Sequence, residues 1–231
     1  MCQSLTNRCS ISYLCRCAAA FNVSAVCLVG SRQFNTFGSH GSDVYLTYLH
    51  FETLEECCAR LKTVYACTII GIEIMDSAPP VHAAEWPGSV AFMLGNEGQG
   101  LSNRQIRLCD SFVYIPQYGA GTASLNVAVA ASIVLHHFAI WAGFPESKRY
   151  GQKYEVGERP FRTWARGVAP SSKMDVNAES REEVACGNIK ETDPSIANDY
   201  CSMDFSEAGV IPAFACQVAE HEEGEAIETN C

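Results

Sequence analysis

The spacing of apolar residues changes repeatedly along residues 1–145, from the three-to-four-residue period of helices to the continuous or alternating runs of strands. Helical spacing occurs in four segments, at residues 12–21, 53–65, 102–109 and 123–141. Strand-like runs occur in five segments, at residues 24–29, 44–50, 68–74, 90–94 and 112–115. Strands that alternate with helices predict an open, mainly parallel α/β sheet, because each parallel pair needs a crossover connection.

Polar residues at the expected helix ends support these assignments. Thr53 stands at an N-cap position, and Glu56 three residues later completes a capping box. Ser102 is the expected cap of the third helix. The long fourth helix should end before Gly143 and Pro145, which both favour helix termination.

The apolar periodicity fades after Pro145, where a strap of mixed basic and aromatic residues follows, centred on residues 151–169. The basic residues are Lys148, Arg149, Lys153, Arg159, Arg162 and Arg166, and the aromatic ones are Tyr150, Tyr154, Phe161 and Trp164. This composition suits contacts with phosphates and stacking on bases. A solvated strap that packs its aromatic side chains on the domain is equally compatible. Residues 170–231 are acidic and have no sustained period, and we expect a disordered tail.

Net charge is distributed unevenly along the chain. The whole sequence carries a formal charge of −10 at pH 7, but residues 171–231 contain 14 acidic and 3 basic residues. The other residues therefore carry about +1, so the acidity belongs to the tail. It does not exclude a nucleic-acid substrate for the folded part.

The 13 cysteines are scattered through apolar segments, which favours free buried thiols in a reducing compartment over a disulfide framework. No CxxC pair occurs, and we expect no metal site. The start does not resemble a signal peptide, and no segment has the roughly 18–20 continuous apolar residues of a membrane helix. We expect an intracellular protein without membrane association, most simply cytoplasmic, with the nucleus or an organelle as alternatives.

A glycine-rich loop follows the strand at residues 90–94. Residues 94–102 read LGNEGQGLS and lead directly into a helix. Three glycines let the backbone approach a ligand closely, as adenosine-like cofactors often require. The segment matches neither GxGxxG nor a P-loop. Taken alone, it is compatible with a cofactor site or with a purely structural turn.

A second strand–glycine loop–helix unit lies about 20 residues later. Residues 115–126 read IPQYGAGTASLN. The carboxyl ends of parallel strands share one edge of a sheet, which is where open α/β sheets bind ligands. The two loops are therefore expected to converge on one crevice.

These segments resemble the signature motifs of the SpoU (TrmH-type) branch of the SPOUT RNA methyltransferases. Residues 94–102 and 115–134 look like the second and third motifs, and Arg16 with the AAAF run at 18–21 is similar to part of the first. The resemblance implies an S-adenosylmethionine-dependent ribose 2′-O-methyltransferase domain at residues 1–150, acting on tRNA or rRNA. It also implies a C-terminal trefoil knot and a homodimer.

The resemblance assigns a role to individual residues. The residues implied in the cofactor pocket are Leu94, Gly95, Glu97, Ile115, Gln117 and Leu125. Arg16 falls where the family places the arginine that handles the reactive ribose, and its permanent charge suits orienting the hydroxyl and offsetting developing charge. Ser124 and Asn126, near a helix N-terminus, would hold a phosphate or the substrate ribose. From the sequence pattern alone, Arg16 would be interpreted as a surface cation, Ser124 as the N-cap of the helix and Asn126 as a polar residue of its first turn.

The chain departs from the family pattern at several points. Ser10 stands where the first motif has Asn, and Asn22 stands where it has Gly. The strand that should precede the first motif is nearly absent, so the first strand of the domain is expected to be truncated. Glu73, at the end of a buried strand, is interpreted as a satisfied polar group of the core.

Two other function classes remain as alternatives. One is a catalytically impaired RNA-binding or dimerisation module that keeps the knotted fold. The other is a nucleotide-binding oxidoreductase, which requires an acidic residue about 20 positions after the first glycine loop. That neighbourhood holds Gln117 and Tyr118, which argues against the oxidoreductase.

Overall fold

The computed structural model describes residues 7–96, 98–160, 167–169 and 213–218. Its helices are α1 (Asn7–Ala20), α2 (Leu54–Val64), α3 (Asn103–Leu108) and α4 (Val127–Trp141), with short 3₁₀ turns η1 (Ser42–Tyr45) and η2 (Val81–Ala83). Its strands are β1 (Ala25–Val29), β2 (Thr47–Phe51), β3 (Thr68–Ile72), β4 (Val90–Leu94), β5 (Ser111–Val113), β6 (Arg149–Tyr150), β7 (Lys153–Tyr154) and β8 (Ala213–Val218).

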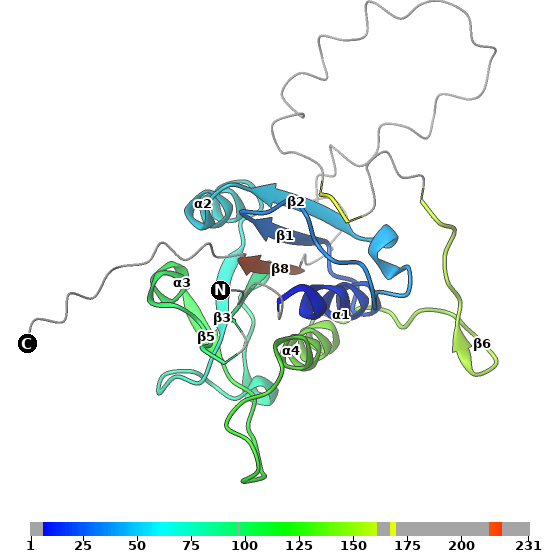
Figure 1. The fold of residues 1–231 in the computed structure, drawn as a ribbon. Helices are drawn as coiled ribbons and strands as arrows, with labels where there is room; N and C mark the ends of the chain where they lie inside the picture. The colour runs from blue at the N-terminus through cyan, green and yellow to red at the C-terminus, as the bar shows by residue number, and fades with distance from the viewer. Residues whose placement is uncertain (1–6, 97, 161–166, 170–212, 219–231) are drawn as a thin grey trace, which may run out of the picture.

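Six of these strands form one sheet in the order β2-β1-β8-β4-β3-β5 (Figure 1). Every pairing in this sheet is parallel. The sequence-based expectation of an open, mainly parallel α/β sheet is therefore confirmed. The order places the carboxyl ends of β3, β4 and β5, which precede the loops of interest, beside one another.

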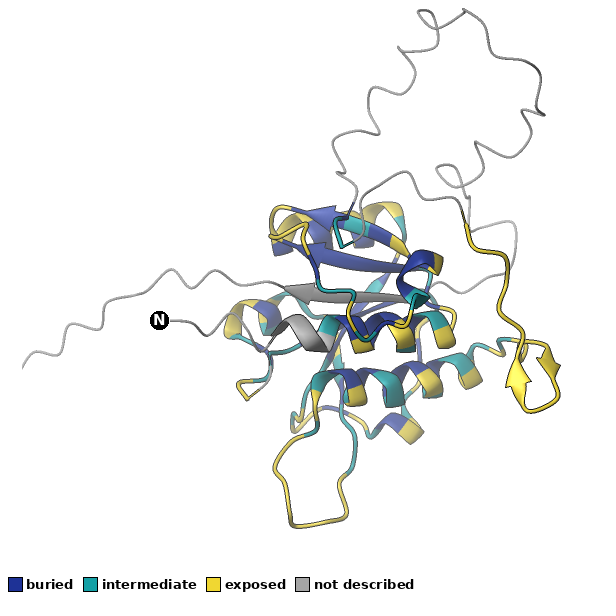
Figure 2. Cartoon of the chain, turned by 45° about the vertical axis from the view of Figure 1, so that its right-hand side comes forward, coloured by how far each residue is buried: buried dark blue, intermediate teal, exposed yellow. Residues whose placement is uncertain are grey.

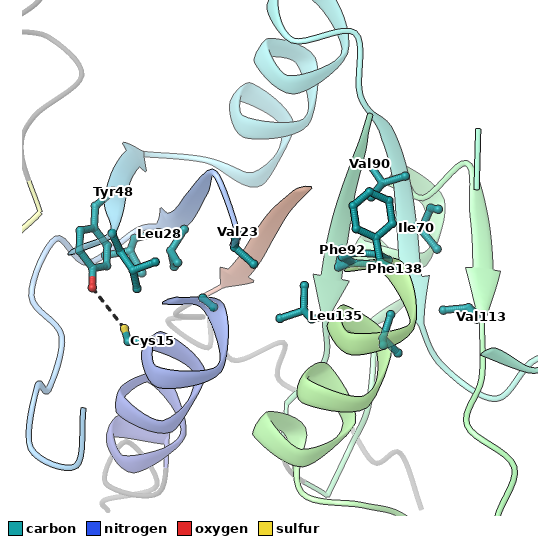
Figure 3. Close-up of a cluster of buried hydrophobic side chains, with 14 of the residues drawn as sticks. Cys15, Val23, Leu28, Tyr48, Ile70, Val90, Phe92, Val113, Leu135 and Phe138 are labelled. Atoms are coloured by element: carbon teal, nitrogen blue, oxygen red, sulfur yellow. Dashed lines mark hydrogen bonds between the residues drawn. The ribbon is translucent and has the colours of Figure 1, made fainter. Parts of the chain in front are cut away.

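Helices cover both faces of the sheet, because alternate strand residues point to opposite sides. On one face, Val26 of β1 and Phe92 of β4 belong to the same apolar cluster as Cys15 of α1 and Phe138 of α4. Figure 3 shows part of this cluster, including the hydrogen bond that the Tyr48 hydroxyl donates to Cys15 Sγ at 3.3 Å.

On the other face, Cys27 and Met93 from the same two strands pack against α2 and α3 through Leu61 and Ile106. The strands β1 and β4 are buried at every residue, whereas the outer faces of the helices are exposed (Figure 2). The result is a three-layer α/β/α arrangement with the sheet in the centre.

Strand β8 corrects the expectation of a disordered tail for residues 213–218, whereas residues 170–212 and 219–231 lie outside the described residues. Residues 213–218 pair with β1 on one side and with β4 on the other, five residues to each. The AFACQV segment is short and lies between acidic stretches, so the average composition of the tail hid it. Within the described residues, no strand precedes α1. Strand β8 lies in the middle of the sheet, between β1 and β4.

Several element boundaries differ from those that the sequence predicted, and the first helix begins at Asn7 and not at residue 12. The fourth helix begins at Val127 and not at residue 123, because Asn126 is its N-cap. The strand expected at 44–50 is divided into η1 and β2. The predicted caps of the other helices are confirmed, since the side chain of Thr53 accepts from Glu56 N and Ser102 forms a capping box with Gln105.

The strap after α4 is described only in part. Residues 149–154 form the exposed antiparallel pair β6–β7. Residues 167–169 return to the domain, where Ala169 is buried and its carbonyl oxygen accepts two hydrogen bonds from the Arg32 guanidinium, at 3.0 and 2.8 Å. Packing of the strap on the domain thus occurs at this end. Phe161, Arg162, Trp164 and Arg166 lie outside the described residues.

Candidate functional site

A cavity of about 330 Å³ lies at the carboxyl edge of the sheet, where β3, β4 and β5 end and α4 begins. The first part of its lining follows β3 and β4: Ile72, Glu73, Ile74, Leu94, Gly95, Asn96, Gly98, Gln99 and Gly100. The second part follows β5 and enters α4: Tyr114, Ile115, Gln117, Ala123, Ser124, Leu125, Val127 and Ala130. The expected convergence of the two glycine loops on one crevice is confirmed.

The first glycine loop, residues 94–101, folds back on itself. Asn96 and Gly100 exchange backbone hydrogen bonds, Asn96 N to Gly100 O at 2.9 Å and Gly100 N to Asn96 O at 3.0 Å. A Cβ atom at Gly95 would lie 2.6 Å from the carbonyl oxygen of Gly100. Only glycine fits there, because any side chain would force the loop open.

Glu73 fixes this loop from the neighbouring strand. Its Oε2 accepts a hydrogen bond from Leu101 N at 2.8 Å, and its Oε1 accepts one from Ile74 N at 3.1 Å. Gly100 has a positive φ of 70°, and a Cβ there would overlap the Glu73 carboxylate. The carboxylate therefore occupies the space that a side chain at residue 100 would need.

The far end of the first glycine loop is held by the cap of α3. Gln105 is buried, and its Nε2 donates to Leu94 O at 3.1 Å. Its Oε1 accepts from Ser102 N at 2.9 Å, which closes the capping box. One buried amide thus ties the start of the loop to its end.

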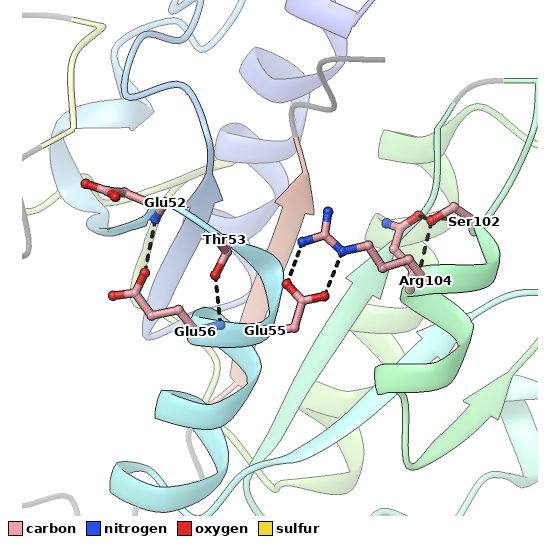
Figure 4. Close-up of polar contacts among 7 residues, drawn as sticks. Glu52, Thr53, Glu55, Glu56, Ser102 and Arg104 are labelled. Atoms are coloured by element: carbon pink, nitrogen blue, oxygen red, sulfur yellow. Dashed lines mark hydrogen bonds and ion pairs between the residues drawn. The ribbon is translucent and has the colours of Figure 1, made fainter. Parts of the chain in front are cut away.

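An ion pair links α3 to α2 near this point. Figure 4 shows the Arg104 guanidinium against the Glu55 carboxylate, with Nε donating to Oε1 at 2.7 Å and Nη2 donating to Oε2. Hydrogen bonding from Arg104 lowers the pKa of Glu55 to about 2. Both side chains are about half exposed, so the pair is expected to contribute little to stability at high salt.

The second glycine loop, residues 114–126, is anchored at its start and exposed at its tip. Tyr114 N donates to Pro79 O at 3.2 Å, and Val81 N donates to Tyr114 O at 2.8 Å. Tyr118 is 92% exposed. Thr122 Oγ1 donates to Ser124 O at 2.8 Å and forms a local turn. Much of the tip is exposed (Figure 2).

Most of the residues expected in the cofactor pocket come together here. Leu94, Gly95, Ile115, Gln117 and Leu125 all line the cavity, and Ser124 lies among them. Glu97, which was also expected there, lies outside the described residues.

Two residues expected to act on the substrate have other positions. Asn126 does not line the cavity, and its Oδ1 accepts from Ala128 N and Val129 N at 3.0 and 3.4 Å. It therefore caps α4, the role that was considered for Ser124. Arg16 is exposed on α1 and is not part of the cavity lining.

Helix α1 nevertheless lies against the wall of the cavity. Leu14 forms an apolar cluster with Leu94 and Ala131, and Val127 of α4 packs against it. Arg16 lies two residues further along α1 and is exposed. The first and second sequence motifs are therefore neighbours in space.

Sequence reasoning missed several residues of the lining. Glu73 was interpreted as a core polar group, although it lies where a parallel strand ends. That position was the available signal, because polar residues at such ends face the ligand crevice. Ile72, Ile74 and Tyr114 carried no comparable signal, since apolar residues after a strand are common in any core.

Buried thiols are the other titratable groups of note. Burial raises the pKa of Cys58, Cys67 and Cys109 to about 12, so these thiols stay protonated and unreactive at neutral pH. Among the described residues, no three His, Cys, Asp or Glu side chains are grouped to hold a metal ion. The described helices include none long and apolar enough to cross a membrane.

The chemistry of the lining fits a nucleoside-sized ligand. Three glycines of the first loop, Gly95, Gly98 and Gly100, line the cavity and contribute only main-chain atoms to it. Apolar side chains such as Ile115 and Leu125 supply apolar contact area, and the Glu73 carboxylate adds a hydrogen-bond acceptor. A mostly apolar cleft of a few hundred Å³ with a few polar groups is typical of cofactor sites.

Comparison with known proteins agrees with this description. The model of the SpoU rRNA Methylase family matches residues 3–136, more than half of the chain. The 23S rRNA (guanosine-2′-O-)-methyltransferase RlmB of Acinetobacter baylyi is 29% identical over 126 residues, which cover 52% of this chain and 50% of that protein. RlmB of Neisseria meningitidis is 33% identical over 95 residues, covering 41% and 37%. The chain thus spans half or less of the length of these relatives.

Solved structures show the same fold. The TrmH/SpoU tRNA modifying enzyme of A. aeolicus superimposes with a TM-score of 0.53 and 22% identity, over 60% of this chain and 71% of that one. The SpoU methyltransferase AviRb of Streptomyces viridochromogenes, in complex with AdoMet, gives a TM-score of 0.51 and 23% identity, over 58% and 54%.

Proposed function

Since the chain belongs to the SpoU rRNA methylase family, we propose that it transfers a methyl group from S-adenosylmethionine to a ribose 2′-hydroxyl of tRNA or rRNA. The family uses this cofactor. The observation that carries the proposal is the cavity between the two glycine loops, which is lined by five of the residues expected to bind the cofactor. A cytoplasmic location goes with this proposal, as does a trefoil knot in the C-terminal part of the domain.

In this proposal the two loops hold the cofactor largely by main-chain groups. Glu73 and Gln105 keep the first glycine loop in place before the cofactor arrives, so little ordering is required on binding. Bound S-adenosylmethionine supplies a methyl group that its sulfonium already activates. The protein then has mainly to bring the hydroxyl into line, which can provide much of the rate enhancement.

Arg16, Ser124 and Asn126 are proposed to act on the RNA side. Ser124 is exposed at the cavity, where its hydroxyl can reach a ribose or phosphate of the substrate. Arg16 would orient the hydroxyl and balance negative charge as the proton leaves. Asn126 would act through the position of Ser124 and the N-terminus of α4, which it caps.

A homodimer is part of this proposal, as the family resemblance implies. The exposed apolar side chains of α4, which are Val129, Ile140 and Trp141, are available for such contact. Light scattering on the purified chain tests the point, and a strictly monomeric particle would contradict it.

The test of the function is ribose-methylation mapping of total RNA from cells with and without this protein, together with calorimetry of S-adenosylmethionine binding. The proposal expects saturable binding and at least one methylated position that depends on the protein. Binding without any dependent position would favour the alternative of a catalytically impaired RNA-binding module. The exposure of Arg16 outside the cavity lining is the observation that keeps this alternative open.

A further inference from the structure

Among the described strands, only β8 pairs with both halves of the main sheet. Strands β2 and β1 form one half, and β4, β3 and β5 form the other. The strands β1 and β4 do not pair with each other, because β8 lies between them. Figure 3 shows its ribbon between the strand that carries Leu28 and the strand that carries Val90.

We propose that β8 joins the two halves and thereby sets the position of the first glycine loop, so that docking of β8 and binding of the cofactor are coupled. The link to the cofactor rests on the proposed function. The role of β8 in the sheet does not.

Leaving the position of β8 empty would cost free energy, because the strands on both sides of it, β1 and β4, are buried. Val26, Phe92 and Met93 are at most 1% exposed. Without β8, the backbone N–H and C=O groups along these facing edges would lose their partners inside the core, which folded proteins avoid. The separation of β1 from β4 would also leave a gap of about 10 Å, two strand spacings wide, and no side chain of an adjacent strand can fill it.

The register brings β8 directly to the cofactor site. Gln217 pairs with Leu94, the residue at which β4 ends and the first glycine loop begins. Leu94 lines the cavity, and its carbonyl oxygen accepts the Gln105 hydrogen bond that ties the loop to α3. A shift of β4 therefore moves the loop, and the pairing with β8 is what holds β4 against β1.

The chain itself supplies the occupant of this position. The AFACQV segment is apolar at five of its six positions, which suits a strand flanked on both sides by fully buried strands. Because five of its six residues pair with each neighbour, it is a central strand and not an edge addition.

Hydrogen exchange on the full chain without cofactor tests the structural part. The amides of residues 213–218 should exchange at least about a hundredfold more slowly than an unprotected chain, as those of β1 and β4 do. Exchange at the unprotected rate would overturn the proposal. Protection that disappears on roughly hundredfold dilution would also overturn it, because it would identify a second copy as the donor of the strand.

A proline variant tests the coupling. Ala215→Pro places a residue without an N–H in the middle of β8, opposite Val26 and Phe92. We expect S-adenosylmethionine affinity to fall at least about tenfold and the melting temperature to drop. Glu158→Pro, which introduces a proline at an exposed residue outside the sheet, is the control and should leave both unchanged.

The outcomes separate the two proposals. Reciprocity requires that saturating S-adenosylmethionine slow the exchange of the β8 amides further in the wild-type chain. Unchanged exchange, or an Ala215→Pro variant that binds as tightly as the wild type, would overturn the coupling. If β8 is protected but the wild type binds no S-adenosylmethionine, the proposed function fails while the role of β8 in the sheet stands.

Discussion

Replacing Glu73 by alanine removes the acceptor that holds Leu101 N of the first glycine loop, together with the acceptor of Ile74 N. The Leu101 N–H, on a residue that is only 6% exposed, would lose its partner at 2.8 Å. An unsatisfied buried donor costs about 1–3 kcal/mol. If the loop relieves this cost by opening, cofactor affinity should fall roughly five- to a hundredfold, since 1.4 kcal/mol corresponds to a factor of about ten.

Glu73→Gln is the more discriminating variant. One amide oxygen can still accept from Leu101 N, but the amide nitrogen would face the Ile74 N–H, so two donors would oppose each other. We therefore expect an affinity between those of the wild type and Glu73→Ala. Glu85→Ala is a suitable control, because Glu85 lies on the same connection, is exposed and does not line the cavity.

Calorimetry with S-adenosylmethionine gives the affinity, and urea unfolding gives the stability of each variant. The two should fall together in the order Glu85→Ala, Glu73→Gln, Glu73→Ala. A Glu73→Ala protein with wild-type affinity would refute the reasoning, because it would mean that the loop keeps its position without the carboxylate.

Three other predictions follow from the site. Gly95→Val should abolish cofactor binding, because the added side chain would push Gly95 and Gly100 of the first glycine loop apart. Gly119→Ala should fold normally, because no atom lies within 4 Å of the added Cβ. Near-ultraviolet circular dichroism compares the folding of the two variants, and calorimetry compares their cofactor affinity. Arg16→Ala should retain cofactor affinity but lower methyl transfer by a factor on the order of 10²–10³, measured with tritiated methyl groups on total RNA, and wild-type turnover would contradict its catalytic role. Arg104→Ala should slightly lower the free energy of unfolding at neutral pH. The difference in this free energy between variant and wild type should shrink as pH falls from 4.5 through about 2, because Glu55 becomes protonated in both proteins. A difference that stays constant with pH in urea unfolding would contradict the ion-pair assignment.

The sequence was sufficient to predict the parts of the fold that rest on local pattern. Buried strands such as 90–94 and caps such as Thr53 were placed correctly, because apolar runs and capping side chains act over a few residues. The two glycine loops were also located, and the family that they indicated is the one whose model matches the chain.

The remaining features depend on long-range contacts that no local pattern encodes. Strand β8 lies far along the chain from both partners, and five apolar residues in a six-residue segment of an acidic region do not predict a central strand. The sequence also did not show that a Cβ at Gly95 would collide with the backbone of Gly100 in the same loop. Glu73 could be interpreted only after its distance to Leu101 was known.

The central position of β8 has a consequence for how the protein is made. Ala25 pairs with Phe214, so β1 cannot complete its pairing until a segment much later in the chain has been synthesised. Pairing across so long a stretch of chain is intrinsically slow, because loop-closure entropy must be overcome before the contact forms. Until residues 213–218 have been synthesised, the apolar edges of β1 and β4 stay open to other chains. We therefore expect the nascent chain to be most prone to aggregation before this strand is complete.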